Sequence, residues 1–385
     1  MRIGILSMQR IYNYGSWLQA YGLKKMLENV SGESVEFVDY RIERPQYCNG
    51  FNWISYLKNV TKVGLIDLIA SNRVLTKLTH NKQFEHTYRF RKEFWKKLGL
   101  TDKPNYSPEL DLLVVGSDEV FNCFQENVRV GYSKELFAQN SRAKKTFTYA
   151  APFGNTTMEK IKAFGKEKEL AQWLSCFERI SVRDSNSLAV VKGLLGGEVE
   201  SNLDPVLMYD FQKEIANCSL TEEQKRQMSK PYMIVYAYPN RLEAQEIETL
   251  RQYAADRGLQ IYGISGYQSY ADEMIYASPL EVLAYFAHAE CVVTDTFHGT
   301  IFSVINQKPF VTLVRKSVNG SYGNQEKLED LLNKLHLSQR CTFDPSNMVD
   351  ILRTPIQFEE ANAVIKTERV KTMSYLTEVV NACKD

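Results

Sequence analysis

The chain has 385 residues, a formal net charge of +1 and a hydrophobic content of 44%. One hydrophobic core rarely serves a chain of this length, so two domains are expected. The near-zero charge gives no reason to expect a nucleic-acid partner, and no apolar run reaches the ~20 residues that a membrane-spanning helix needs. The seven cysteines are scattered and form no CxxC pair, which favours reduced thiols, a cytoplasmic location and no metal site.

The first half of the chain alternates between strand and helix patterns. Residues 2–6 predict a strand, apolar residues at helical spacing predict a helix over 15–28, and residues 35–40 alternate like a second strand. Such a βαβ unit favours a parallel sheet. Further strands are predicted at 112–115, 146–150, 180–182 and 199–203, with helices at 157–174 and 185–194.

The second half repeats this alternation. Strands are predicted at 232–236, 260–264, 291–293 and 309–313, and helices at 241–257, 279–287, from Gly299 onward, 325–335 and 359–382. The pattern predicts an α/β protein with two doubly wound Rossmann-like domains, at residues 1–215 and 216–355, that face one another across a cleft. The last helix, within 356–385, is expected to pack back on the first domain.

Residues 45–105 interrupt the alternation and predict a helical insertion in the first domain. Between Lys58 and Lys97 there are ten Lys or Arg against three acids, and aromatic residues are interleaved with them. A basic amphipathic insertion of this kind can lie on an anionic membrane surface through residues 51–97. The alternative is a solvated helical excursion that covers the domain, which is the more common use of a charge run.

The turn at residues 294–302 is the strongest functional signal. It lies between a predicted buried strand and a predicted helix, which is where α/β sheets place their ligands. Its imidazole (His298), carboxylate (Asp295), hydroxyls (Thr296 among them) and helix N-terminal amides near Gly299 suit an anionic substrate. The alternative is that residues 294–296 only cap the helix and that His298 is a surface residue.

Four further polar turns follow predicted strands. Asn13, Tyr14 and Gly15 open the first helix, where backbone amides can approach an anion. Ser117 and Asp118 follow the strand at 112–115, and a second carboxylate stands next to Asp118, so this turn faces solvent or serves a ligand.

The third and fourth turns lie at residues 150–154, where small residues permit a close approach, and at residues 181–185. In the fourth turn, Arg183 is a forked donor that suits a carboxylate or a phosphate. Its alternative use is a structural ion pair with Asp184 or Asp204. Together, these turns favour an active site between the two domains.

As a set, these stretches resemble the polysaccharide pyruvyl transferase family over nearly the whole chain. The departures from the family pattern are mild: Glu119 and Phe121 stand where Gln and Trp are frequent, and Thr296 stands where Ser is usual. The matching stretches are residues 13–21, 115–122, 149–154, 181–184, 203–205, 294–302 and 308–310.

The resemblance implies a fold similar to that of GT-B glycosyltransferases and no cofactor. The implied reaction moves a pyruvyl group from phosphoenolpyruvate to two hydroxyls of a sugar in a cell-surface glycan precursor, such as that of a capsule or exopolysaccharide. It forms a cyclic ketal and releases phosphate. The acceptor would be a sugar or a lipid-linked oligosaccharide, and the location would be cytoplasmic, with the inner face of the membrane as an option.

This chemistry needs an acid, a base and an anion clamp. His298 is the candidate acid or phosphate ligand, Arg183 the candidate clamp, and Asp118 the candidate base on the acceptor side. Residues expected to bind substrate are Asn13, Tyr14, Gly15, Ser117, Tyr149, Phe153, Asp295, Thr296, Phe297 and Gly299.

Two other functions fit the sequence. A GT-B glycosyltransferase that uses a nucleotide-sugar would share the fold but would need a pocket for base and ribose. A carbohydrate-binding or scaffold protein without catalytic activity, recruited to membranes through residues 51–97, would need neither donor.

Overall fold

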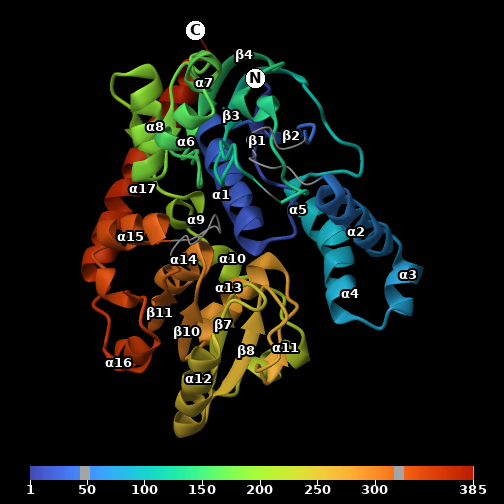
Figure 1. Cartoon of the computed structure of the whole chain (residues 1–385), viewed down its shortest axis with the longest axis vertical. Helices are drawn as coiled ribbons and strands as arrows, with labels where there is room; N and C mark the ends of the chain where they lie inside the picture. Colours follow the sequence, from blue (N-terminus) through green and yellow to red (C-terminus); the bar gives the residue numbers. More distant parts are fainter. Residues whose placement is uncertain (44–52, 126, 316–324, 385) are drawn as a thin grey trace. The chain divides into compact units, whose positions relative to one another are not determined.

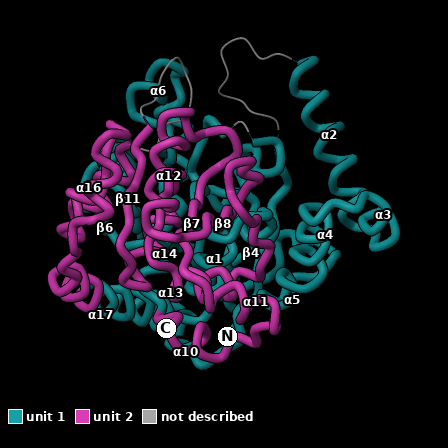
Figure 2. Tube along the Cα trace, turned by 90° about the horizontal axis from the view of Figure 1, so that it is seen from below, with its two compact units in different colours: residues 1–209, 368–385 teal, residues 210–367 magenta. Residues whose placement is uncertain are grey.

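The computed structural model describes residues 1–43, 53–125, 127–315 and 325–384. The chain divides into two compact units: unit 1 is Met1–Tyr209 with Glu368–Asp385, and unit 2 is Asp210–Thr367 (Figure 2). The expected boundary after residue 215 therefore falls inside α10 (Gln212–Ala216), the first helix of unit 2. The last helix, α17 (Glu359–Asn381), contributes residues to both units.

Unit 1 contains a parallel sheet in the order β2-β1-β3-β4, visible in Figure 1. A bridge between Phe147 and Arg179 extends the parallel arrangement toward the short pair of strands β5 and β6. This is the flavodoxin-like order of doubly wound sheets, in which the direction of strand addition reverses between β1 and β3. The strands are β1 (Ile3–Leu6), β2 (Val35–Val38), β3 (Glu109–Val115), β4 (Arg142–Thr148), β5 (Ser181–Val182) and β6 (Glu200–Ser201).

The helices of unit 1 follow the strands closely. The Asn13 side chain caps α1 by accepting a hydrogen bond from the Ser16 amide at 3.1 Å. The predicted helix at 157–174 is wrong as one element, because Gly165 adopts φ +62° and separates α6 from α7. The helices outside the insertion, with one 3₁₀ turn, are α1 (Tyr14–Ser31), η2 (Lys134–Phe137), α6 (Met158–Ala163), α7 (Glu167–Leu174), α8 (Ser185–Leu195) and α9 (Pro205–Met208).

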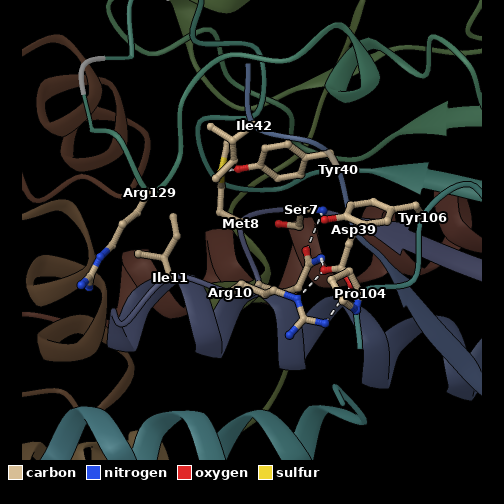
Figure 3. Close-up of a pocket in the computed structure, with 11 residues that line it drawn as sticks. Ser7, Met8, Arg10, Ile11, Asp39, Tyr40, Ile42, Pro104, Tyr106 and Arg129 are labelled. Carbon is tan, nitrogen blue, oxygen red and sulfur yellow. Dashed lines mark hydrogen bonds and ion pairs between the residues drawn. The ribbon is translucent and has the colours of Figure 1, made fainter. Parts of the chain in front are cut away.

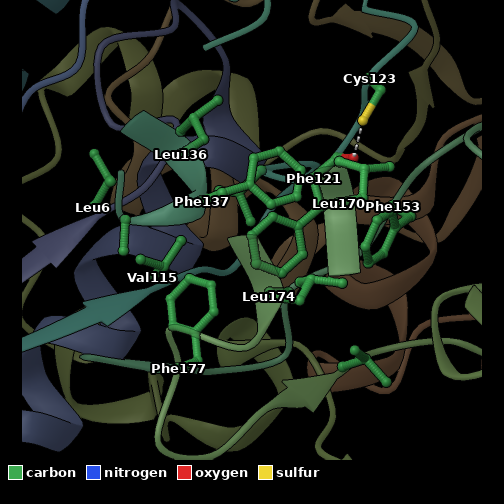
Figure 4. Packing of buried hydrophobic residues seen from close by; sticks show 14 of the residues in the cluster. Leu6, Val115, Phe121, Cys123, Leu136, Phe137, Phe153, Leu170, Leu174 and Phe177 are labelled. Atoms are coloured by element: carbon green, nitrogen blue, oxygen red, sulfur yellow. Dashed lines mark hydrogen bonds between the residues drawn. The ribbon is translucent and has the colours of Figure 1, made fainter. Parts of the chain in front are cut away.

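An aromatic cluster fills the core beside the end of β3 (Figure 4). The ring of Phe121 stacks on Phe137 with centroids 4.7 Å apart and lies 5.1 Å from Phe153. The turn that leads to Phe121 starts at Gly116, whose φ is +128°. A Cβ at Gly116 would lie 2.1 Å from the carbonyl oxygen of Tyr149, so only glycine fits this approach of β3 to the segment after β4.

The predicted helical insertion is present between β2 and β3, and in both views its helices α2 and α3 lie at the outside of unit 1 (Figures 1 and 2). Hydrogen bonds to α1 hold it in place: the Trp17 indole donates to the carbonyl of Phe94 and the Tyr14 hydroxyl contacts His86 Nε2, each at 3.0 Å, and Lys24 donates to the carbonyl of Leu98 at 2.8 Å. Residues 45–52 of the prediction lie outside the described residues. The elements are α2 (Trp53–Ser71), α3 (Arg73–Leu78), α4 (Lys82–Arg89), the π-helical η1 (Phe90–Phe94) and α5 (Trp95–Leu98).

Unit 2 contains a six-stranded parallel sheet in the order β12-β11-β10-β7-β8-β9. Read from its other edge, this is the Rossmann order 3-2-1-4-5-6, which reverses between β7 and β10. The strands are β7 (Tyr232–Tyr236), β8 (Gln260–Ile264), β9 (Glu273–Met274), β10 (Cys291–Thr294), β11 (Phe310–Leu313) and β12 (Cys341–Thr342).

The helices of unit 2 include one whose predicted start is wrong. Helix α12 begins at Ala244 rather than at Arg241, because the Glu246 carboxylate accepts a hydrogen bond from the Glu243 amide at 2.8 Å and closes the helix start there. Arg241 therefore lies in the loop after β7. The other elements are α11 (Glu222–Met228), α12 (Ala244–Arg257), α13 (Pro279–His288), α14 (Phe297–Ile305), α15 (Gln325–Lys334), η3 (Ser338–Arg340), η4 (Pro345–Asn347) and α16 (Met348–Arg353).

Two α/β units with parallel sheets confirm the predicted Rossmann-like fold class. Within the described ranges, no helix combines the length and the apolar character needed to cross a membrane.

The attachment of the insertion predicts a dependence of stability on pH. Burial, with the nearby charge of Arg89, lowers the pKa of His86 from 6.5 to about 3. The unfolded chain therefore takes up a proton on His86 between pH 6.5 and 3 while the folded chain does not, so stability is lost as the pH falls through this window.

We expect His86 to lower the free energy of unfolding by about 1 to 2 kcal/mol at pH 5 relative to neutral pH. Urea unfolding across the window, compared between the wild-type chain and His86→Gln, measures this. The pH profile of the variant should be flatter by that amount, and superimposable profiles would contradict the assignment.

Candidate functional site

In unit 2, the turn between β10 and α14 is built by its threonines. The Thr294 hydroxyl donates to the carbonyl of Tyr236 at 2.6 Å, and the Thr296 hydroxyl accepts from the Gly299 amide at 2.9 Å. A Cβ at Gly299 would lie 2.1 Å from Thr294 Oγ1, so glycine is required for this packing. The capping role that was the alternative for Thr296 is therefore present, and it fixes the first turn of α14.

Asp295 and Arg241 meet at the point where the sheet of unit 2 reverses its strand order. Asp295 follows β10, Arg241 follows β7, and Arg241 Nε lies 2.9 Å from Asp295 Oδ2. Burial raises the pKa of Asp295, while the charges of Arg241 and Arg315 act in the opposite direction. Such a reversal point is where doubly wound sheets bind ligands, beyond the carboxyl ends of the strands.

A second arginine follows the neighbouring strand β11. The two terminal nitrogens of Arg315 hold the two carboxylate oxygens of Glu246 at 2.7 and 2.8 Å, and Glu246 is buried. Tyr270 is also buried here, and burial together with the charges of Asp295 and Glu246 raises the pKa of its hydroxyl. Sequence reasoning missed Arg241, Arg315 and Tyr270, although a cation in the loop after each of two buried strands was a usable signal.

His298 lies in the first turn of α14 and is the partly exposed residue within the otherwise buried stretch 291–304. Its ring lies against Phe302, with centroids 6.1 Å apart, while the preceding Phe297 is buried. Of the predicted residues 295–299, Asp295 contacts Arg241, which was not predicted.

In unit 1, the turns after β1 and β3 also meet at the point where strand order reverses. The Ser16 hydroxyl donates to the Asp118 carboxylate, so the helix start formed by Asn13, Tyr14 and Gly15 lies beside Asp118. Asp118 has φ +65° and also accepts a hydrogen bond from the Glu119 amide at 2.9 Å. Its position is therefore set by the backbone turn as well as by Ser16.

A buried hydrogen-bond network supports this turn from below. Gln19 accepts from the Ser117 amide at 3.1 Å and donates to the Ser7 hydroxyl at 2.8 Å, and Ser7 in turn donates to the carbonyl of Ser117 at 3.0 Å. The Ser117 hydroxyl donates to the carbonyl of Ala150 at 2.8 Å. Ser117 was expected to bind substrate, but its side chain is fully buried and serves this network.

Tyr149 and Phe153 were also expected to contact substrate, and the structure places both in the core. The Tyr149 hydroxyl is held by the carbonyl of Leu203 and by the Thr372 hydroxyl, each at 3.1 Å. Phe153 packs in the aromatic cluster around Phe121. Both side chains have no exposed area.

Arg183 forms the structural ion pair that was its alternative use. Its Nη1 lies 2.7 Å from Asp204 Oδ2, and the two side chains are 5% and 0% exposed. Burial acts to lower the pKa of Arg183, but the carboxylates of Asp204 and Asp184 hold it above its ordinary value. The guanidinium is thus engaged within unit 1.

A pocket of about 300 Å³ opens beside the loops after β1 and β2 in unit 1 (Figure 3). Arg10 crosses it and binds both carboxylate oxygens of Asp39, at 2.6 and 2.8 Å. None of the residues expected to bind substrate lines this pocket. Its remaining walls include Ile11, Tyr40, Ile42, Tyr106 and Arg129. Across the described part of the chain, no group of three or more His, Cys, Asp or Glu side chains is gathered as metal ligands are.

Comparison with solved structures gives distant similarities that extend over the whole chain. The UDP-forming α,α-trehalose-phosphate synthase from Burkholderia vietnamiensis has 10% identity and a TM-score of 0.49, with 99% of each chain covered. The UDP-GlcNAc 2-epimerase from Methanocaldococcus jannaschii, solved with UDP-GlcNAc and UDP, has 8% identity and a TM-score of 0.47, covering 97% of this chain and 100% of that one.

Comparison with curated proteins gives no match. A family model, by contrast, matches residues 13–317, a stretch that contains Asp118, Arg241 and the whole of α14. The chain belongs to the polysaccharide pyruvyl transferase family.

Proposed function

We propose that the chain transfers a pyruvyl group from phosphoenolpyruvate to two hydroxyls of a sugar in a cell-surface glycan precursor, giving a cyclic ketal and phosphate. Membership of a transferase family supports a transfer reaction. The observation that carries the donor is the contact of Arg241 with Asp295 directly before α14, the helix whose first turn contains His298.

Phosphoenolpyruvate presents a carboxylate and a phosphate on three carbons, and it therefore needs several convergent donors. Arg241 and Arg315 offer two planar guanidinium groups held in place by Asp295 and Glu246. The helix dipole of α14 and its first amides add positive potential at the same place. Sequence reasoning gave the clamp to Arg183, but these two arginines of unit 2 suit that role better because both act on Asp295, three residues before His298.

The proposed reaction has two additions at the same carbon. Protonation of the methylene carbon makes the methyl group and leaves an oxocarbenium-like centre at C2, which one sugar hydroxyl attacks with loss of its proton. The C2–O bond to phosphate then breaks, the phosphate takes up a proton, and the second hydroxyl attacks and loses its own. His298 is the proposed proton donor, either to carbon or to phosphate.

Unit 1 is the proposed acceptor side. Asp118 is oriented by Ser16 and by the Glu119 amide, which suits a base that takes the proton of a sugar hydroxyl. The neighbouring pocket, with the Arg10–Asp39 pair and two tyrosine rings, offers the mixture of polar groups and apolar surface that small-molecule sites use.

We predict that His298→Gln lowers kcat for acceptor-dependent phosphate release from phosphoenolpyruvate by about 100-fold or more, because it removes a proton donor but keeps a polar side chain. A coupled phosphate assay measures this. His288→Gln on α13 is the matched control in unit 2 and should retain activity. Full activity of His298→Gln, or release that needs no acceptor, would contradict the proposal.

A second prediction separates the arginines. Arg241→Met and Arg315→Met should each raise KM for phosphoenolpyruvate about tenfold, whereas Arg183→Met should leave KM unchanged and lower the free energy of unfolding by about 3 kcal/mol, because it strands buried Asp204. The paired variant Arg241→Met with Asp295→Asn checks that the kinetic effect is not a loss of folding. If Arg183→Met were the one variant of the three with a raised KM for phosphoenolpyruvate, Arg183 would be the residue that binds the anion.

Thermal-shift measurements distinguish the nucleotide-sugar glycosyltransferase alternative. We expect phosphoenolpyruvate to raise the Tm of the chain and UDP or GDP to leave it unchanged. The opposite pattern would favour the glycosyltransferase.

A further inference from the structure

The outer face of the helical insertion carries several large exposed apolar side chains. On α2, Trp53, Ile54, Leu57, Leu65 and Leu68 are each between 50% and 68% exposed. By helical periodicity these five positions fall on one side of α2, with Thr61 and Gly64 between the first three and the last two. Surface helices normally turn polar residues outward, and an exposed apolar stripe marks an interaction surface.

The opposite face of α2 already has its partners. Residues 56, 63 and 66 are half-buried and Ala70 is fully buried, and α2 contacts α3 and α4 within the insertion. The apolar stripe is therefore additional to the side that holds the helix in place. Helix α3 continues the surface with Val74 and Leu78, each 67% exposed.

Basic side chains border this apolar surface. Exposed Lys or Arg stand at 58, 62, 73, 77 and 82, and none of the five forms an ion pair with a described residue. The acid of this stretch, Asp67, is turned inward and accepts a hydrogen bond from Arg129 at 2.8 Å. The border thus carries uncompensated positive charge.

We propose that unit 1 docks on an anionic lipid bilayer through the outer face of α2 and α3. A stripe of large apolar side chains that enters the boundary between headgroups and acyl chains, edged by lysines that meet anionic headgroups, is the pattern of interfacial helices. Apolar side chains edged by lysines without described acidic partners match the charge of an anionic bilayer.

The ion pair between Arg129 and Asp67 connects the proposed membrane-binding surface with the pocket of unit 1. Arg129, which binds Asp67 of α2, also lines the pocket and lies over the ring of Tyr12 at 4.8 Å. Docking through α2 would thus hold the pocket wall at a fixed position relative to the bilayer. The inference goes beyond the proposed transfer reaction, because it states where the chain works and does not depend on the donor.

The test is co-sedimentation of the full chain with vesicles of phosphatidylcholine alone or of phosphatidylcholine with phosphatidylglycerol. We expect binding to the anionic vesicles that weakens as salt is raised, and little binding to the neutral ones. Absence of binding to either kind would overturn the proposal.

Two variants with matched controls locate the surface. Each of two triple variants should weaken vesicle binding about tenfold or more. The apolar variant combines Ile54→Gln, Leu57→Gln and Leu65→Gln. The charge variant combines Lys58→Glu, Lys62→Glu and Lys77→Glu. The controls are Leu195→Gln with Val370→Gln, and Lys162→Glu with Lys168→Glu, which change exposed side chains of unit 1 outside the insertion. Equal losses in the controls would contradict the assignment.

Sedimentation velocity without vesicles distinguishes a lipid surface from a second copy of the chain. We expect the wild-type chain and the apolar variant to have the same oligomeric state. A wild-type dimer that dissociates in the apolar variant would overturn the proposal in favour of an interface between copies. Because vesicle binding is measured without substrate, its failure is distinguishable from failure of the transfer reaction.

Discussion

The contact between Asp295 and Arg241 is the interaction on which the candidate donor site depends. A carboxylate buried at the end of β10 is costly by itself, and the guanidinium after β7 offsets part of that cost. The two residues meet only because β7 and β10 are neighbours in a sheet whose strand order reverses between them. Arg315, which follows the neighbouring strand β11, forms a second ion pair with buried Glu246.

In unit 1, neutral side chains hold the turn that contains the Asp118 carboxylate. The turn that presents Asp118 is tied to β1, to α1 and to the segment after β4 by Ser7, Gln19 and the Ser117 hydroxyl, all of them buried. A fully satisfied buried network of this kind specifies one conformation, since leaving any member unpaired would cost the desolvation of a polar group. The position of Asp118 is therefore a property of the core as much as of the surface.

The sequence predicted what is local and missed what is long-range. Buried parallel strands are short apolar runs, so β1, β7 and β10 could be recognised, together with the polar turns that follow them. Arg241 was assigned to a helix because helical spacing continues back to it, and only the contact between Glu246 and the Glu243 amide shows where α12 begins.

The pocket escaped sequence reasoning for a different reason. It forms where the loops after β1 and β2 meet residues near 104 and 129, and no local pattern reports such a meeting. For Arg183, the local pattern allowed two uses. A forked donor after a strand is equally suited to a ligand and to Asp204, and only the fold decides between them.

The division of the chain has a consequence for the order in which it folds. Unit 1 is discontinuous, since its last helical segment, from Glu368, follows the whole of unit 2. The Tyr375 hydroxyl donates to the carbonyl of Thr148 at the end of β4, from 227 residues further along the chain. On the ribosome, unit 2 is therefore synthesised before Tyr375, the partner of the Thr148 carbonyl in unit 1. Unit 1, whose first strand is made earliest, is thus completed only after unit 2 has been synthesised.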